Sequence, residues 1–131
     1  MYLIKGPDDI VNIIAKQGES FALSITVNMN LISYSSRGQI RDGYGLSASL
    51  IKAFNCVVQT IDTTSGLVLI TLSATDTSAI PAYKTQVVSS NIALLQGVGV
   101  YYYDIEIYTL NDADVKRILQ GKIIFDPEVT V

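Results

Sequence analysis

Two acidic side chains stand two positions apart in the segment Tyr103-Asp104-Ile105-Glu106-Ile107. In a β-strand such residues share one face, so Asp104 and Glu106 would lie about 7 Å apart. Paired carboxylates can carry out glycoside hydrolysis, one as the acid and the other as the base or nucleophile. Charges that alternate with apolar residues are more typical of the solvated face of a strand. We therefore interpret Asp104 and Glu106 as surface residues rather than a catalytic pair.

A second acidic pair, Asp112 and Asp114, lies in the run Asn111-Asp112-Ala113-Asp114. Closely spaced carboxylates can bind calcium, but a calcium loop supplies further oxygen ligands in a longer pattern. Here Val115 and Lys116 follow directly. Because Asn and Asp are also typical of tight turns, the run predicts a turn between two strands and no metal site.

Most other catalytic chemistry lacks the residues that it needs. The chain of 131 residues has no histidine and a single cysteine, Cys56. This composition excludes Ser-His-Asp and Cys-His catalysis, histidine metal sites and thiolate zinc sites. No Walker loop is present, and Gly97 and Gly99 lack the third glycine of a dinucleotide-binding motif. The sequence predicts a non-enzymatic protein with no cofactor and no metal, in which Cys56 is a buried, inert thiol.

Composition and charge bear on the partners of the protein. Apolar residues make up 49% of the chain and charged residues 16%, against about 25% charged residues in ordinary soluble domains. The net charge of −3 and the lack of Lys/Arg runs argue against nucleic acid as a partner. No apolar run approaches about 18 residues, so no membrane span is predicted. The apolar excess favours a homo-oligomer or symmetric assembly, with an apolar-rich monomer as the alternative.

Period-two alternation of apolar and polar residues is the dominant pattern of the chain, and it is typical of half-buried strands. Residues 21–27 show it most simply, with Phe21, Leu23, Ile25 and Val27 on one face. Residues 10–15 precede this strand, and further strands are expected at 34–41, 46–51, 56–61, 67–72, 100–110 and 115–125. One short helical turn is expected near 75–80, capped by Ser73 or Thr75 and ended by Pro81.

These elements predict a single all-β domain over residues 1–131, an antiparallel β-sandwich of immunoglobulin-like type, with a closed barrel as the alternative. In the strand at 100–110, alternation turns Tyr101 and Tyr103 toward the core and Tyr102 and Tyr108 outward. Tyrosine is enriched at protein interfaces, so Tyr102 and Tyr108 are candidate interface residues; the alternative is that they are ordinary surface tyrosines.

Residues 82–99 show no convincing period and are expected to form a loop or arm. The segment is long for a connection between strands, and it is too apolar to remain solvated at low cost. Its candidate interface residues are Val87, Val88, Ile92, Leu94 and Leu95. We expect them to contact a neighbouring subunit; the alternative is that the segment folds back and extends the core of its own domain.

The two strands that flank the acidic turn at 111–114 are expected to form a hairpin. In such a hairpin Arg117 would lie within reach of both Asp104 and Glu106. Gly121, in the second strand, is expected to allow a β-bulge.

Four stretches, taken in order, resemble a known family. They are Lys16 to Phe21; Tyr34 to Arg41, which reads Tyr-x-x-Arg-x-Gln-Ile-Arg; Thr71 to Thr77 with Ile80-Pro81; and Tyr103 to Ile107 followed by Arg117 to Gly121 and Pro127 to Thr130. Their order and spacing resemble the N-terminal domain of siphophage baseplate upper proteins. The insertion at 82–99 departs from that pattern.

The resemblance implies a β-sandwich that docks into a phage tail or baseplate. We therefore expect a non-enzymatic structural subunit of a tailed phage virion, an adaptor in the tail, baseplate or fibre-attachment region. Its partners would be other virion structural proteins, and it would reside in the virion after assembly in the host cytoplasm. The alternatives are a capsid decoration or neck protein, and a small carbohydrate-binding β-sandwich that uses Tyr102, Tyr108 and Asp104.

Overall fold

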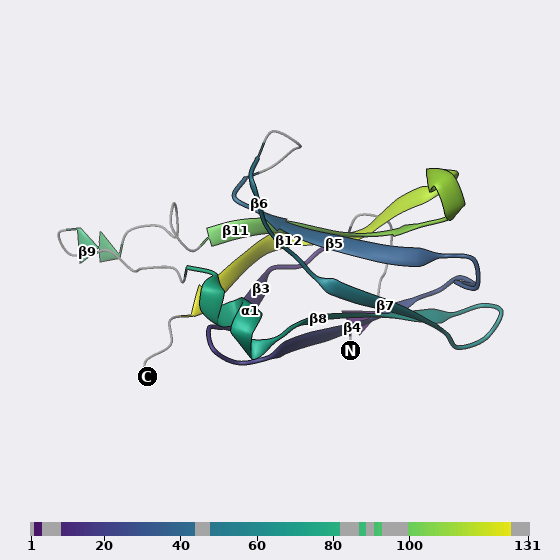
Figure 1. Ribbon diagram of the computed structural model, residues 1–131, viewed down its shortest axis with the longest axis horizontal. Helices are drawn as coiled ribbons and strands as arrows, with labels where there is room; N and C mark the ends of the chain where they lie inside the picture. Colours follow the sequence, from purple (N-terminus) through teal and green to yellow (C-terminus); the bar gives the residue numbers. More distant parts are fainter. Residues whose placement is uncertain are drawn as a thin grey trace.

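The computed structural model describes residues 2–3, 9–43, 48–81, 87–88, 91–92 and 100–126 (Figure 1). Strands dominate this part of the chain, which also contains one short α-helix and one 3-10 helix. The predicted all-β fold is therefore confirmed. Residues 21–27 form a strand with the predicted bounds, because one face of this segment is apolar from end to end.

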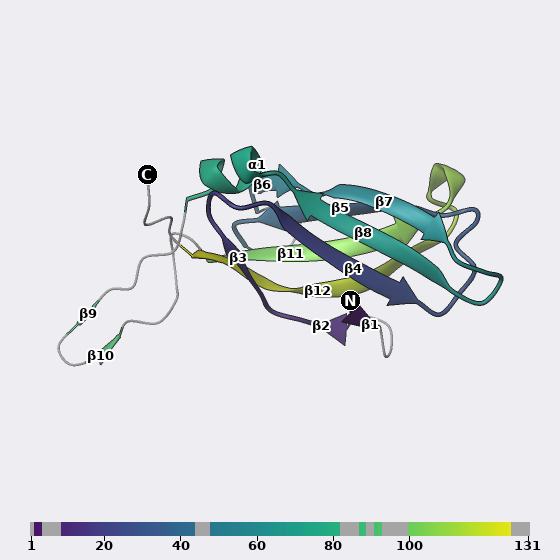
Figure 2. The same ribbon diagram turned by 90° about the horizontal axis from the view of Figure 1, so that it is seen from below.

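The strands form two main sheets. The first contains β1 (Tyr2–Leu3), β4 (Phe21–Val27), β8 (Gly66–Leu72) and β7 (Asn55–Thr60), in that order. The second contains β2 (Asp9–Ile10) and β3 (Ile13–Lys16), both paired with β12 (Val115–Asp126), followed by β11 (Val100–Tyr108), β5 (Ser35–Arg41) and β6 (Leu50–Ala53). Figures 1 and 2 show the two sheets as two layers. The finer expectation, a β-sandwich of immunoglobulin-like type, stays a prediction.

The core lies between the layers because the strands turn an apolar face inward. On β8, buried residues alternate with half-buried ones along the whole strand. On β11, Tyr101, Tyr103, Ile105 and Ile107 are all buried, as alternation predicted. The apolar face of β4 also points inward, but its first half is only partly buried against the core.

The chain passes from one sheet to the other through a single buried residue, Phe54, which separates β6 from β7. The backbone N–H of Phe54 donates to the carbonyl of Gly38 at 2.9 Å. The ring of Phe54 meets that of Tyr103 edge-on, with centroids 6.1 Å apart. An aromatic side chain at the crossing thus joins the edge strand of each sheet to the common core.

Most strand pairs are antiparallel, as predicted, but three pairs are parallel. These are β1 with β4, β2 with β12 and β3 with β12. All three involve the first 16 residues, which pair first with one sheet and then with the other. The alternation of apolar residues says nothing about strand direction, so the sequence did not indicate them.

The predicted helical turn is α1 (Ala74–Ala79). Ser73 is the N-cap, and its hydroxyl accepts from the N–H of Asp76, whose carboxylate accepts from the N–H of Ser73 in return. The hydroxyl of the fully buried Thr77 accepts from the N–H of Gly18 at 3.0 Å and donates to the carbonyl of Glu19. The helix is thereby fastened to the turn that precedes β4.

The β-bulge expected at Gly121 lies elsewhere. The register between β11 and β12 shifts between Ile105 and Glu106, opposite Ile118, so that two consecutive residues of β12 are buried. Gly121 serves a different purpose: a Cβ atom there would overlap the carbonyl oxygen of Val11. Glycine is needed because another stretch of backbone passes against it.

Three connections meet at one end of the layers, at the right of Figure 1: residues 28–34, 61–65 and 109–114. The register agrees, since Val27 pairs with Gly66 and Tyr108 pairs with both Ser35 and Val115. Helix α1 and the turn before β4 lie at the opposite end (Figure 2).

Candidate functional site

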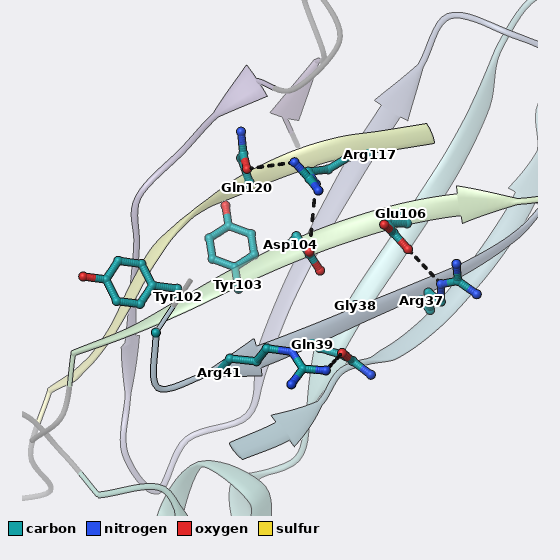
Figure 3. A pocket seen from close by; sticks show the side chains of 11 residues that line it. Arg37, Gly38, Gln39, Arg41, Tyr102, Tyr103, Asp104, Glu106, Arg117 and Gln120 are labelled. Atoms are coloured by element: carbon teal, nitrogen blue, oxygen red, sulfur yellow. Dashed lines mark hydrogen bonds and ion pairs between the residues drawn. The ribbon is translucent and has the colours of Figure 1, made fainter. Parts of the chain in front are cut away.

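A shallow pocket of about 670 Å³ lies on the outer face of β12, β11 and β5 (Figure 3). Alternation places the polar residues of β5 and β11 there, and the bulge at Ile118 puts Arg117 and Gln120 of β12 on the same face. The polar side chains that line it are Arg37, Gln39 and Arg41 from β5, Tyr102, Asp104 and Glu106 from β11, and Arg117 and Gln120 from β12. Residues more than 60 positions apart in sequence are thus brought together.

Strand register sets which of these side chains face each other. Glu106 lies opposite Arg37, and the guanidinium Nε of Arg37 contacts Glu106 Oε1 at 2.8 Å. A second nitrogen of Arg37 lies 3.4 Å from Asp112. Arg37 therefore joins the pocket to the loop at 109–114.

The expectation that Arg117 reaches both carboxylates is confirmed for Asp104, at 3.9 Å from Nε to Oδ2. Glu106 is held by Arg37 instead, although Glu106 and Arg117 are paired in the register. Arg117 also donates to Gln120 at 3.5 Å. Sequence reasoning missed Arg37 because its partner lies on a strand 69 positions away.

The third arginine of the pocket, Arg41, contacts Ala48 and Gln39. Its guanidinium donates to the carbonyl of Ala48 at 2.8 Å and to the side-chain oxygen of Gln39 at 2.7 Å. Each of the three arginines is thus engaged with its own chain. This arrangement favours the interpretation of Asp104 and Glu106 as members of a surface ion-pair network.

The pKa of Asp104 lies above the ordinary value of an aspartate. Partial burial raises this pKa, and the negative charge of Glu106 raises it further. Arg117, Arg41 and Arg37 act in the opposite direction. The folded protein therefore holds a proton on Asp104 more tightly than the unfolded chain does, so Asp104's contribution to stability falls as pH rises through the folded pKa.

We expect charge removal around Asp104 to move its pKa in two opposite directions. Glu106→Gln should lower the pKa, and Arg117→Ala should raise it, as followed by ¹³C NMR titration of the carboxyl carbon. Asp62 is the reference carboxyl group, because its pKa is shifted in the opposite direction: hydrogen bonds from Thr64 and Ser65 lower it. If neither substitution changed the pKa of Asp104, this result would contradict the ion-pair network.

The acidic run at 111–114 forms the expected turn. Thr109 and Asp114 close it through backbone and side-chain hydrogen bonds, among them Asp114 N–H to Thr109 Oγ1 at 2.8 Å. The carboxylate of Asp114 accepts from the hydroxyl of Tyr34 and lies 3.3 Å from Lys116 Nζ. Within the described residues, no three Asp, Glu, Cys or His side chains are grouped as metal ligands would be.

The tyrosines of β11 divide between the two faces as predicted. The hydroxyls of Tyr101 and Tyr103 donate to the carbonyls of Pro81 and Val11, at 2.8 and 2.6 Å. Tyr102 and Tyr108 are half-buried on the outer face. Lys122 Nζ lies 6.0 Å from the ring centre of Tyr102, and the Arg37 guanidinium lies 4.4 Å from that of Tyr108. A role for these two tyrosines at an interface stays a prediction.

Part of the segment at 82–99 is described. Val87 and Val88 form β9 (Val87–Val88), and Ile92 lies in β10 (Asn91–Ile92). These two strands pair with each other in an antiparallel, two-stranded sheet of their own. Leu94 and Leu95 lie outside the described residues. Contact of this segment with a neighbouring subunit stays a prediction.

Cys56, expected as a buried thiol, is half-buried against the core. Burial raises its pKa, so less of the reactive thiolate forms at neutral pH. This environment fits the expected inert role.

Exposed apolar side chains are a feature that sequence reasoning missed. Eight large ones are between 41% and 84% exposed: Ile10, Ile14, Ile32, Leu50, Val57, Ile61, Leu110 and Val115. Leu110 and Ile32 stand inside turn segments rich in Asn and Ser or Asp. A large apolar residue within a polar turn is the sequence pattern that could have identified these two residues as exposed.

Comparisons with known proteins place the chain in no family. No family model matches it, and no curated protein matches it. Among solved structures, it is similar to a family 123 glycoside hydrolase from Clostridium perfringens, with 12% identity and a TM-score of 0.41. The match covers 94% of this chain and 24% of that one, so this chain spans about a quarter of the hydrolase. A likeness this distant carries no argument about function. Within the described part of the chain, no helix has the length and apolar character needed to cross a membrane.

Proposed function

We propose that this chain is a non-enzymatic structural subunit of a tailed phage virion, an adaptor in the tail, baseplate or fibre-attachment region. The observation that carries the proposal is the grouping of large exposed apolar side chains on a fold with a well-formed core. Single exposed apolar residues are ordinary on a protein surface. Grouped ones mark surfaces that a partner covers.

Two groups stand out on the described surface. Ile10 and Ile14, 73% and 67% exposed, follow one another along the edge formed by β2 and β3. Ile32, Ile61 and Leu110 lie at the end where three connections meet. A subunit with neighbours on more than one side would present apolar surface in this way, and the low share of charged residues agrees with it.

The polar pocket supports the non-enzymatic part of the proposal. Its two carboxylates contact arginines, and its arginines are bound to neighbouring side chains and a backbone carbonyl. A general acid or nucleophile needs a reactive group directed at a substrate. Here the charged groups of the pocket are directed at each other.

Gold-labelled antibody against this chain, applied to purified particles and viewed in negative stain, tests the location. Label at the tail tip, baseplate or fibre-attachment region is the expected result. Label on the capsid or neck would support the alternative of a decoration or neck protein. Particles that lack the chain altogether would refute a virion role, provided that mass spectrometry of the same particles agrees.

A carbohydrate-binding domain is the second candidate function, and the pocket itself favours it. Tyr102 and Asp104 line one depression, where an aromatic ring and a carboxylate could contact a sugar. If this function holds, a glycan array should detect a ligand that Tyr102→Ala and Asp104→Asn both abolish. Tyr108, the third residue expected at a sugar site, does not line this pocket, and Arg37 lies over its ring, so Tyr108→Ala is the matched control.

A further inference from the structure

Three neighbouring connections at one end of the fold each present one large apolar side chain. Ile32 in 28–34, Ile61 in 61–65 and Leu110 in 109–114 are 77%, 54% and 84% exposed. We call these three residues the loop-end triad. These three side chains are exposed, although most of the large apolar residues on the strands that the connections join lie in the core.

The connection at 28–34 is held firmly while Ile32 points outward. Its neighbour Leu31 is only 1% exposed and packs where a side chain on Gly66 would otherwise lie. The N–H of Ile32 donates to the side chain of Asn30, and the N–H of Tyr34 donates to the carbonyl of Leu31, both at 3.0 Å. Leu31 therefore anchors the loop, and Ile32 is left for an external contact.

The connection at 61–65 is organised around one carboxylate. Asp62 Oδ1 accepts from the N–H of Thr64 at 2.8 Å and from the hydroxyls of Thr64 and Ser65. The N–H of Ile61 donates to the carbonyl of Ser65 at 3.2 Å. These bonds hold the backbone that carries Ile61.

The connection at 109–114 contains two successive residues with positive φ, Asn111 and Asp112, at 59° and 54°. The closed turn between Thr109 and Asp114 holds this conformation, and Leu110 is exposed within it. The bond from the Tyr34 hydroxyl to Asp114 joins this loop to the loop at 28–34. Preorganised loops lose little conformational entropy on binding, so the triad is suited to rigid docking.

Charge indicates the chemistry of the partner. The three connections contain Asp62, Asp112 and Asp114 and neither lysine nor arginine. The cations on adjoining strands, Arg37 and Lys116, are paired with Asp112 and Asp114. Arg37 also pairs with Glu106, so carboxylates outnumber cations in this region, and a second copy of this end would bring like net charge against like, which is unfavourable.

We infer that the loop-end triad docks onto a partner protein whose contact surface has an apolar centre and a rim of Lys or Arg. The apolar centre receives Ile32, Ile61 and Leu110, and the basic rim faces the aspartates. This inference rests on the proposal that the chain is a subunit of an assembly, and it names the surface and the partner chemistry of that assembly. The partner is a different protein, not a second copy of this chain.

The test compares two double variants in purified particles. Ile32→Ser with Leu110→Ser alters the triad, and Leu50→Ser with Val57→Ser alters two side chains that are each 51% exposed on β6 and β7. Copies per particle, counted by quantitative mass spectrometry, should fall about tenfold or more for the triad variant and stay within about twofold for the control. Equal incorporation of both variants would overturn the inference. If the triad variant melts well below the unaltered chain, the single variants Ile32→Ser and Ile61→Ser take its place.

A photo-crosslinking amino acid at position 110 identifies the partner surface in the intact particle. The expected adduct lies on another virion protein, at an apolar site flanked by Lys or Arg. An adduct on the triad of a second copy, or on a site without basic residues, would overturn the inference. Asp62→Lys should also lower incorporation, because it reverses one of the three charges and removes the hydrogen bonds that hold the backbone of Ile61.

Failure of the inference can be told from failure of the proposed function. If the unaltered chain is present in particles but the triad variant is incorporated normally, the function stands and the surface is wrong. If the unaltered chain is absent from particles, the virion role is wrong. The adduct at position 110 is then mapped in the producing cells. An adduct on another protein, at an apolar site flanked by Lys or Arg, supports the inference. An adduct at any other site overturns it.

Discussion

Replacing Ile105 by alanine is expected to lower the free energy of unfolding by about 2–5 kcal/mol, the range for a large aliphatic side chain removed from a packed core. Ile105 is 0% exposed and lies between Leu119 on β12 and Gly38 on β5. Its Cδ1 atom fills the space above Gly38, within 2.5 Å of where a Cβ would stand. The cavity left by alanine cannot be refilled from β5, because glycine has no side chain to move. Urea denaturation followed by circular dichroism measures the loss.

Two further substitutions are compared with Ile105→Ala, one at an exposed position and one at a partly buried position. Val57→Ala removes a side chain that is 51% exposed on β7, and it should change stability by less than about 0.5 kcal/mol. Phe21→Ala should have an intermediate effect, because this ring is only partly buried, 6.3 Å from that of Phe54. A loss below about 1 kcal/mol for Ile105→Ala would mean that the inward face of β11 is wrongly assigned.

Gly121→Ala should lower stability by about 3 kcal/mol, the upper part of the range for overpacking, because the obstacle is backbone rather than a mobile side chain. A Cβ at this position would overlap the carbonyl oxygen of Val11. The same carbonyl accepts from the Tyr103 hydroxyl, and the N–H of Val11 donates to the carbonyl of Gln120 at 2.8 Å. The methyl group would push residues 9–16 away from β12, and both bonds would be lost with them.

Hydrogen exchange measured by mass spectrometry should show this effect as faster exchange in residues 9–16, together with the lower midpoint in urea. Gly43→Ala is the control, because its Cβ would lie 3.5 Å from that of Ala48, an ordinary van der Waals contact. If Gly121→Ala and Gly43→Ala were equally stable, the close approach of the Val11 backbone would not be what requires glycine.

Local pattern was sufficient to predict most of the secondary structure. The strand at 21–27, the turn at 111–114 and the helical turn before Pro81 could be predicted because each depends on residues within a few positions of one another. Alternation also assigned the inward side of β11, since a period of two leaves just two faces to choose between. The separation of Tyr101 and Tyr103 from Tyr102 and Tyr108 follows from the same rule.

The candidate site was predictable only in part. Sequence placed Asp104 and Glu106 on one outward face and Arg117 near them, because a hairpin brings neighbouring strands together. It did not place Arg37 against Glu106, because that contact needs β5 to lie beside β11, and the sequence does not state which distant strands become neighbours. The position of the bulge at Ile118 and the role of Gly121 likewise depend on which backbone packs against β12.

The sequence by itself determined the strand-forming segments, their buried faces and the chemistry that its residue types exclude. These properties are local, because they depend on side-chain size, polarity and period along a single strand. Tertiary structure alone decided the order and direction of the strands, the ion pairs of the pocket and the placement of the connections that carry Ile32, Ile61 and Leu110 at one end (Figure 1). Each of these depends on contacts between residues tens of positions apart, such as Tyr103 with Val11 at a separation of 92, which form only when distant segments of the chain come together in the folded protein.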